Sequence, residues 1–462
     1  MLSFEVIREL RDALGRDRVL TDIEDLVCYA FDAAGGLDEH VPGVIVMPET
    51  AGEVQAVVRI ADRYSLPVYP RGSGTNLSGG TLPERGGVVV SLLRMNRILE
   101  VDTDNLTATV EPGVIIQDLN DACAPYGLMY PPDPGTVAQA TMGGSVAECS
   151  GGLRGLKYGV TKHYVLGLSV VLPDGEMARF GGKTVKNVSG YDMVHLFTGS
   201  EGTLGIITEI TVKLLPLPEY RRTMMAAFLD LDSAGRAVAR IIEGRVIPAT
   251  LEILDNTTIR AVEEYNRCGL PLDAAAILLI EVDGVKEAVE REAAKVMAAL
   301  LDSGASFVRL AETEREREQL WTARRTALPA LSRVRPSMMV EDATVPRNRV
   351  PEMLKEIRTI AEKYGVIIGT MGHAGDGNLH PTILTDISDE QEMVRVRQAI
   401  DEVYAAALKL GGTLSGEHGI GRTKQKYMEM EFSQAALSAM RAVKRALDPK
   451  GLFNPGKLVG EV

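Results

Sequence analysis

Apolar positions near the start of the chain alternate between short strand-like runs and one helical stretch. "GVIVMP" at 43–48 and "GVVVSL" at 87–92 are runs of strand length. Between them, residues 50–65 carry apolar side chains at helical spacing, and Thr50 with Glu53 has the spacing of a capping box. This order predicts an α/β arrangement for the first part of the chain.

Strands joined by tight turns follow this part. Runs 98–103 and 107–113 read as two strands with a polar turn between them. Residues 165–181 form a predicted hairpin with Asp174 and Gly175 in its turn. Two prolines after residue 215 then mark a predicted domain boundary.

A second region repeats one pattern. Residues 224–242 and 274–301 each give a strand, an acidic cap and an amphipathic helix. In the second helix one apolar face is expected to hold Val285, Val289, Val296 and Leu300. The pattern predicts a duplicated α+β unit with an antiparallel sheet, and the stretch from about residue 425 is helical again.

The length of 462 residues exceeds one ordinary core and favours two or three domains. With 45% apolar and 24% charged residues, the composition is that of a globular protein. The formal net charge of −13 argues against a nucleic-acid partner, whose binding surface would be basic. No apolar run is long enough to span a bilayer, and the first residues predict an amphipathic helix instead of a signal peptide.

The four cysteines are widely scattered: Cys28, Cys123, Cys149 and Cys268. No CxxC pair exists, which argues against an iron–sulfur cluster or a zinc ribbon within the chain. Few cysteines and no export signal predict a cytoplasmic location.

Three glycine-rich stretches stand out in the first region. "PRGSGTNLSGG" at 70–80 follows a predicted strand, and its glycines permit close backbone approach to a ligand. It is neither a GxGxxG fingerprint nor a P-loop, and taken alone a surface turn explains it equally well. The segments 131–159 and 198–208 have the same small-residue character, and the first is expected to be long and irregular. Together they indicate a long cofactor lying across the domain.

Half of the six histidines lie in two short glycine-rich stretches. His373 and His380 flank "AGDGN", which predicts a turn between two strands, and His418 directly follows Glu417. Two imidazoles and a carboxylate would suit a divalent metal with open positions for a substrate. For the two histidines alone, hydrogen-bonded core residues are the simpler interpretation, with Asp376 helping to build the turn. A metalloprotease is excluded because HExxH is absent.

Six motifs occur in a fixed order along nearly the whole chain: "PRGSGTNLSGG", "PPDPGTVAQATMGGSVAECSGG", "TGSEGTLGIIT", "GHAGDGNLH", "SGEHGIG" and "FNPGK". In this the chain resembles the FAD-linked oxidases of the vanillyl-alcohol oxidase and p-cresol methylhydroxylase superfamily. Within it, the chain is similar to the D-2-hydroxyacid dehydrogenases of the glycolate oxidase D subunit and D-lactate dehydrogenase type. The resemblance implies an α+β fold with a PCMH-type FAD-binding domain (1–217), a substrate or cap domain carrying the metal site (218–424), and a C-terminal segment (425–462) returning to the FAD domain.

The resemblance also implies the cofactor contacts. Residues expected to hold FAD are Arg71, Gly72, Ser73, Gly74, Thr75, Asn76, Asp133, Pro134, Gly135, Thr141, Gly143, Gly144, Ala147, Gly151, Gly202, Gly205, Ile206, Asn454 and Lys457. Some members attach FAD covalently through a histidine in the first loop. Here Thr75 and Asn76 stand in a loop without histidine, so the FAD is expected to be noncovalent.

The expected reaction is oxidation of a small D-2-hydroxyacid, D-lactate or glycolate, to the 2-oxoacid, with hydride passing to flavin N5. His373, His380 and Glu417 would hold a divalent metal (zinc, manganese or iron), and His418 would act as the base. Arg324 would grip the substrate carboxylate, although a solvated charged helix is the competing interpretation.

Related D-2-hydroxyglutarate dehydrogenases carry a further lysine and an asparagine at places that here hold Val340 and Thr382. The missing lysine favours a substrate with a single carboxylate. The neighbouring stretch "VEDATVP" is expected to be a strand without a catalytic part.

A second hypothesis is a redox subunit that houses FAD while a partner binds the substrate. The acceptor stays open among a quinone, a dye-like acceptor, oxygen, an electron-transferring flavoprotein and an iron–sulfur subunit, the last two being protein partners. The oligomeric state also stays open, with a homodimer as one option.

Overall fold

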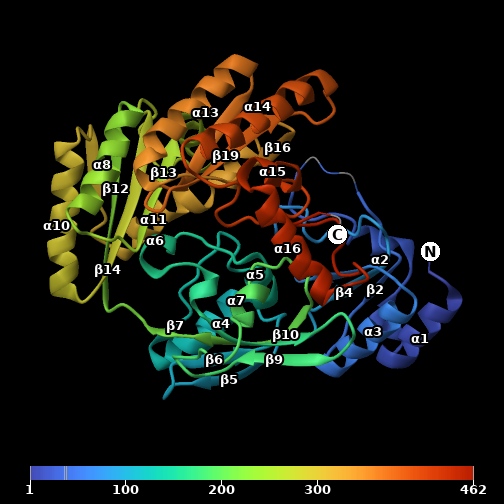
Figure 1. The fold of residues 1–462 in the computed structure, drawn as a ribbon. Coiled ribbons are helices and arrows are strands. Elements are labelled where there is room, and N and C mark those ends of the chain that lie inside the picture. Colours follow the sequence, from blue (N-terminus) through green and yellow to red (C-terminus); the bar gives the residue numbers. More distant parts are fainter. Residues whose placement is uncertain (1, 36, 38, 461–462) are drawn as a thin grey trace. The chain divides into compact units, whose positions relative to one another are not determined.

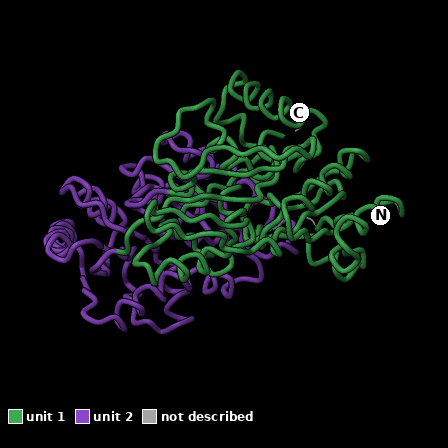
Figure 2. The backbone as a smooth tube through the Cα atoms, turned by 90° about the horizontal axis from the view of Figure 1, so that it is seen from below, with its two compact units in different colours: residues 1–151, 160–217, 417–462 green, residues 152–159, 218–416 purple. Residues whose placement is uncertain are grey.

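The computed structural model describes residues 2–35, 37 and 39–460. The chain divides into two compact units, drawn in two colours in Figure 2. Unit 1 comprises residues 1–151, 160–217 and 417–462, and unit 2 comprises residues 152–159 and 218–416. The chain thus changes unit at 151/152, 159/160, 217/218 and 416/417, whereas the sequence-based divisions lie at 217/218 and 424/425.

Unit 1 begins with the predicted amphipathic helix α1 (Phe4–Leu14), which buries Val6, Leu10 and Leu14. Its first sheet has the order β1-β2-β4-β3, built from β1 (Val19–Leu20), β2 (Val44–Val46), β3 (Val68–Arg71) and β4 (Val88–Ser91). Strands β2 and β3 run parallel to β4, and every residue of β2 and β4 is buried. Such strands are apolar throughout because both of their faces are covered.

Helix α3 (Ala51–Arg63) confirms the predicted capping box. Glu53 N–H donates to Thr50 Oγ1 over 3.2 Å, and Thr50 N–H donates to Glu53 Oε2 over 3.2 Å. The C-terminal segment returns to the edge of this sheet, where Val68 N–H donates to Leu452 O and Asn454 N–H donates to Val68 O, each over 2.8 Å. The return of the chain end to the first domain is therefore confirmed.

The second sheet of unit 1 is antiparallel, with the order β5-β6-β10-β8-β9. Its strands are β5 (Ile98–Asp102), β6 (Thr107–Val110), β8 (Val165–Val171), β9 (Met177–Gly181) and β10 (Ile206–Lys213). The predicted hairpin is β8–β9, and Gly175 has φ +80° in its turn. A two-stranded sheet pairs β7 (Leu128–Met129) with β11 (Leu215–Pro216). The remaining α-helices of unit 1 are α2 (Ile23–Val27), α4 (Ile116–Cys123), α5 (Met142–Glu148), α7 (Met193–Phe197), α15 (Met428–Glu431) and α16 (Gln434–Leu447).

The expectation of a long irregular segment at 131–159 was wrong. The segment contains α5, capped by Thr141, whose Oγ1 accepts from Gly144 N–H over 3.2 Å, and the short helix α6 (Gly155–Tyr158). Glycines made this stretch look irregular. A Cβ on Gly143 would lie 2.6 Å from Pro112 Cβ, so the glycine is needed for close packing of a helix.

Unit 2 holds an antiparallel sheet of eight strands with the order β15-β12-β14-β13-β18-β19-β16, and β17 pairs with β19. The strands are β12 (Tyr220–Phe228), β13 (Thr250–Asp255), β14 (Ala276–Gly284), β15 (Phe307–Leu310), β16 (Ser337–Val340), β17 (Ala343–Thr344), β18 (Ile367–His373) and β19 (Asn378–Thr385). The predicted duplication is visible in Figure 1 as β12 with α8 (Leu231–Glu243) and β14 with α10 (Lys286–Asp302). In α10, Val289, Val296 and Leu300 are buried as expected, but Val285 precedes the helix and is 56% exposed.

Helices cover both faces of this sheet. On one face, α9 (Asn256–Asn266), α11 (Glu314–Arg325) and α12 (Ala327–Leu331) pack on an apolar cluster that includes Leu254, Leu279 and Met371. Helices α8, α10 and α13 (Val350–Tyr364) lie on the other face, and α14 (Glu390–Lys409) packs against α13. The first face carries the predicted histidines.

Candidate functional site

In unit 1 the first glycine-rich loop leaves β3 in a fixed conformation. The buried Arg71 donates to Thr81 Oγ1 over 3.2 Å, and Asn76 donates to Asp32 Oδ2 over 2.7 Å. A Cβ on Gly72 would clash with Thr141, and Gly74 has φ +72°. Among the residues that the structure describes, the backbone N–H groups at 73–76 donate to no other part of the chain. Such a loop suits phosphate oxygens of a cofactor.

Some of the other predicted cofactor residues lie next to this loop within unit 1, Thr141 against Gly72 and Gly202 against Pro70. Glu201 N–H donates to Ala147 O over 2.8 Å, and a Cβ on Gly151 would lie 2.5 Å from Glu417 Oε2. Residues 133–135 precede the first turn of this segment, where Val137 N–H donates to Pro134 O over 2.9 Å. These contacts bring together the starts of α5, β10 and the loop after β3.

Asn454 and Lys457 are already bonded to protein groups. Asn454 Nδ2 donates to Gly80 O and to Glu201 O, each over 2.7 Å. Lys457 is fully buried and its Nζ donates to Glu84 Oε2 over 2.8 Å. Both residues therefore fasten the chain end to the loops at 78–84 and 198–206.

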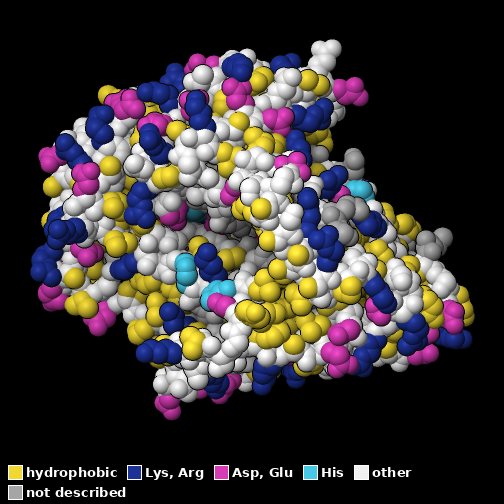
Figure 3. Space-filling view, in the orientation of Figure 1, with side chains coloured by type: hydrophobic (Ala, Val, Ile, Leu, Met, Phe, Trp, Pro, Cys, Tyr) yellow, Lys and Arg dark blue, Asp and Glu magenta, His cyan; other side chains and the backbone are white. Residues whose placement is uncertain are grey.

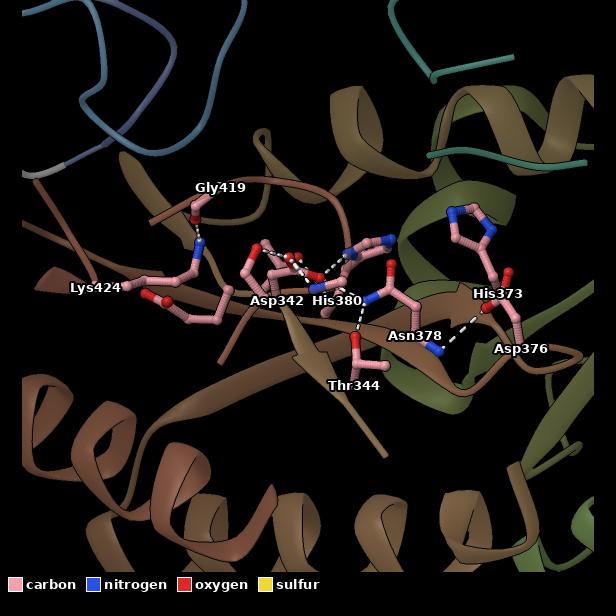
Figure 4. A network of polar contacts seen from close by, with 12 residues as sticks. Asp342, Thr344, His373, Asp376, Asn378, His380, Gly419 and Lys424 are labelled. Carbon is pink, nitrogen blue, oxygen red and sulfur yellow. Dashed lines mark hydrogen bonds and ion pairs between the residues drawn. The ribbon is translucent and has the colours of Figure 1, made fainter. Parts of the chain in front are cut away.

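The loop that carries His418 is fastened in unit 1 by Glu201. Its two carboxylate oxygens accept hydrogen bonds from the backbone N–H groups of Ile420 and Gly421, each over 2.7 Å. A Cβ on Gly419, which has φ +83°, would clash with Glu148 Oε2. The buried Lys424 donates from Nζ to Gly419 O over 3.0 Å, as Figure 4 shows. Sequence analysis did not identify Glu201, although it stands within the "TGSEGTLGIIT" motif.

Two carboxylates lie close together under this loop. Burial, and next the charge of Glu201, raise the pKa of Glu148 well above its ordinary value. Burial also raises the pKa of Glu201, while the hydrogen bonds from Ile420 and Gly421 and the nearby charge of Lys424 oppose that rise. Glu201 is therefore the better-stabilised anion of the pair, and its charge strengthens the hydrogen bonds that it accepts from the two backbone N–H groups.

In unit 2 the predicted turn is confirmed as the hairpin β18–β19. Met371 pairs with His380 and His373 pairs with Asn378, so both imidazoles project from the same face of the sheet. Their ring centroids are 5.2 Å apart with the rings at 84°, and both histidines are buried. The turn requires Gly377, which has φ +94° and whose Cβ would clash with Val345 O.

A residue that sequence analysis missed joins two predicted site residues. Glu252 on β13 has no exposed surface; its Oε1 lies 2.6 Å from His373 Nδ1, and its Oε2 accepts from Arg324 Nε over 2.6 Å. Burial would raise the pKa of Glu252, but the charges and hydrogen bonds of His373 and Arg324 hold it below its ordinary value. The available signal was one carboxylate inside the apolar run "TLEIL" at 250–254.

Arg324 and Arg325, adjacent on α11, take opposite directions. The side chain of Arg324 is 11% exposed and points at the sheet, where Nη1 also lies 3.4 Å from Met371 Sδ. Arg325 is 51% exposed and pairs with Glu318. Helix α11 therefore has a charged, solvated face that includes Arg325 and also directs Arg324 toward the sheet.

The stretch "VEDATVP" has a larger part in the site than expected. It forms the end of β16 and the short β17, with Asp342 between them. Asp342 accepts from Asn378 Nδ2, from Ser415 Oγ over 2.6 Å and from Gly416 N–H over 2.8 Å. Figure 4 shows Asn378 also donating to Thr344. Asp342 thereby ties the histidine hairpin to the residues that precede Glu417.

The structure thus distributes the predicted site residues over both units. Unit 2 brings together His373, His380 and Arg324, whereas Glu417 and His418 belong to unit 1 with the predicted cofactor residues. Charged side chains of both signs are interspersed on the face seen in Figure 3. Within the described ranges, no helix has the length and hydropathy needed to cross a membrane.

Comparisons with known proteins agree with this arrangement. Residues 42–181 match the FAD binding domain model, and residues 217–458 match the C-terminal domain of FAD linked oxidases. The chain is 47% identical to glycolate oxidase subunit GlcD of Bacillus subtilis, covering 99% of this chain and 97% of that protein. It is 34% identical to D-lactate dehydrogenase of Anaerostipes hadrus, covering 98% and 97%.

Among solved structures, p-cresol methylhydroxylase with bound substrate superimposes with a TM-score of 0.80 at 19% identity, covering 99% of this chain and 96% of that one. An alkyldihydroxyacetonephosphate synthase gives a TM-score of 0.78 at 22% identity, covering 99% and 86%. These two likenesses concern the fold.

Proposed function

This chain belongs to the FAD-linked oxidases, and from that premise we propose that it oxidises a small D-2-hydroxyacid, glycolate or D-lactate, to the 2-oxoacid. The observation that carries the proposal is the arrangement on one face of the unit 2 sheet. There the inward Arg324 and the buried His373 share Glu252, and the ring centroid of His380 lies 5.2 Å from that of His373. A 2-hydroxyacid offers a carboxylate for the arginine and a hydroxyl next to it. The names of two relatives, a glycolate oxidase subunit and a D-lactate dehydrogenase, support this substrate class.

FAD would be held noncovalently in unit 1. The residues suited to it are the loop at 71–76, the start of α5 and the residues at 202–206. Glycines let these segments pack closely, and a Cβ on Gly72 would clash with Thr141. Bound FAD would accept the hydride from the substrate carbon. The chain contributes by fixing the loop through the hydrogen bonds of Arg71 and Asn76.

A divalent metal would be held by His373 and His380 together with Glu417. The two buried imidazoles offer nitrogen atoms within 4.8 Å of one another, a donor set suited to zinc, manganese or iron. A metal at this place would act as a Lewis acid for the hydroxyl oxygen. His418 is assigned to accept the hydroxyl proton at its imidazole.

The substrate is proposed to carry one carboxylate. Val340 on β16 pairs directly with Thr382 on β19, and Thr382 lies two residues after His380 on the same face. Neither side chain is a cation, so Arg324 is the residue assigned to the substrate carboxylate. A dicarboxylate would leave its second charge next to a valine and a buried threonine.

A redox partner protein is proposed to take the electrons onward. The Bacillus subtilis relative bears the name of a subunit, which supports work within a complex. An electron-transferring flavoprotein or an iron–sulfur subunit could serve as this electron acceptor.

Anaerobic titration of the purified, FAD-loaded chain tests the proposal. D-Lactate or glycolate should bleach the flavin absorbance without any other protein, whereas L-lactate and D-2-hydroxyglutarate should do so far more slowly. A flavin that stays oxidised until a partner protein is added would instead support a redox subunit whose partner binds the substrate.

A further inference from the structure

Glu252 is a fully buried carboxylate between apolar neighbours on its strand, where an ionised side chain is unusual. It lies on β13, the middle strand of the unit 2 sheet, opposite Leu279 on β14. Leu254, two residues further on the same face, pairs with Met371 on β18. An ionised carboxylate in such apolar surroundings is costly unless it is paired and hydrogen-bonded.

Each oxygen of Glu252 has a different partner. Continuing the register of β13 and β18 places Glu252 opposite His373, which explains the 2.6 Å contact to Nδ1. The other oxygen accepts from Arg324 Nε over 2.6 Å. Neutralising the carboxylate needs only the arginine, so the bond to His373 has a separate consequence.

That consequence is the tautomer of His373. A carboxylate can only accept, so Nδ1 carries a proton, and in the neutral ring that would bind a metal Nε2 keeps the lone pair. Metal-binding histidines commonly donate their second nitrogen to a carboxylate, which fixes the ring and raises its basicity. The same carboxylate aims the guanidinium of Arg324, whose other N–H groups are directed by the bond at Nε.

We infer that Glu252 is a positioning residue that sets His373 as a metal ligand and Arg324 as the carboxylate clamp, and so couples the metal site to the substrate site. This inference rests on the proposed function. It adds to the proposed site a residue, Glu252, that belongs neither to the histidine motif nor to the helix that carries Arg324. Glu252 touches neither substrate nor metal in this role; it acts through two other side chains.

Glu252→Gln tests the inference at constant shape. The amide keeps one acceptor but presents an NH₂ group to its other partner, so it cannot serve both donors. In the FAD-loaded protein we expect metal affinity to fall about 10–100-fold, the usual effect of losing such a partner. KM for the hydroxyacid should rise about tenfold, the size of one lost charged hydrogen bond, while FAD content stays unchanged.

Glu281→Gln is the matched control. Glu281 is a buried carboxylate on the adjacent strand β14, and it accepts from Trp321 Nε1 of the same helix α11 over 3.0 Å and from Thr223 Oγ1 over 2.6 Å. This substitution should lower thermal stability but leave metal affinity and KM close to wild type. Equal losses of metal in both variants would show that Glu252 supports only the packing of α11 and would overturn the inference.

Glu252→Asp covers the case in which the glutamine variant does not fold. It keeps the charge and therefore the balance with Arg324, but it is one methylene too short to reach both partners. Weaker metal binding measured by titration with Zn²⁺ or Mn²⁺ supports the inference, and wild-type metal affinity with wild-type KM overturns it. Wild-type protein that binds no metal and is not reduced by any hydroxyacid would instead refute the proposed function itself.

Discussion

Two buried carboxylates fix predicted catalytic groups in this molecule, and they do so by different means. In unit 2, Glu252 lies on a strand and binds two side chains, those of His373 and Arg324. In unit 1, Glu201 lies in a loop with φ +52° and binds two backbone N–H groups just after His418. One carboxylate therefore orients side chains on a backbone that the sheet already holds, and the other holds the backbone itself.

The difference follows from the elements that carry the two histidine motifs. The register of β18 and β19 puts His373 and His380 on one face through main-chain pairing alone. The segment at 417–421 around His418 is not part of a strand; Glu201 and Lys424 bind its backbone, and Gly419 is left-handed. Substitutions should accordingly change ligand orientation in unit 2 and loop conformation in unit 1.

The largest expected effects separate the metal from the base. His380→Ala removes a proposed ligand and should lose bound metal and activity together while FAD is retained. His418→Ala removes the proposed base and should keep its metal and FAD but lose kcat by about 10²–10⁴-fold. Metal analysis, the flavin spectrum and steady-state kinetics on both variants provide the measurement. If His418→Ala is the variant that empties the metal site, the division between the two motifs is wrong.

The arginine pair on α11 gives the next largest effect. Arg324→Ala should raise KM by about 10–100-fold, because a bidentate charged contact is worth roughly 1.5–3 kcal/mol. Arg325→Ala is the control, since that side chain is half exposed and pairs with Glu318 on its own helix. Substrate titrations of both variants at equal FAD content decide the point, and an unchanged KM for Arg324→Ala would move the clamp elsewhere.

The glycine of the His418 loop should have a smaller effect. Gly419→Ala places a Cβ against Glu148 at φ +83°, where the backbone strain is roughly 1–3 kcal/mol, so the loop must shift. We expect kcat to fall about tenfold. Gly411→Ala has nearly the same backbone conformation, φ +81°, but its Cβ would meet nothing nearer than Pro346 at 3.9 Å. It should cost some stability and no activity. Comparable kcat losses in both variants would show that strain alone, and not loop position, matters.

The last prediction concerns the mode of FAD attachment and tests the first loop. Since residues 71–76 include no histidine, acid precipitation of the holoprotein should release yellow cofactor into the supernatant. Flavin that remains in the washed pellet would indicate a covalent bond and contradict the noncovalent assignment.

The sequence by itself determined features whose causes are local. The capping box of α3, the turn at Gly175 and the hairpin between His373 and His380 each depend on neighbouring residues, and all three stand as expected. The motif order determined the family in the same way, because it needs no knowledge of packing.

Only the tertiary structure decided which groups hold the motifs in place. Glu252, Asp342 and Glu201 lie 121, 36 and 219 residues from His373, Asn378 and Ile420, their respective partners. The local pattern marks Glu252 only as a carboxylate inside an apolar run and does not reveal its partners. The helix α5 was likewise hidden, since the need for Gly143 is seen only from its packing against Pro112. Contacts of this kind arise from strand register and helix packing, which bring together residues that share no sequence periodicity.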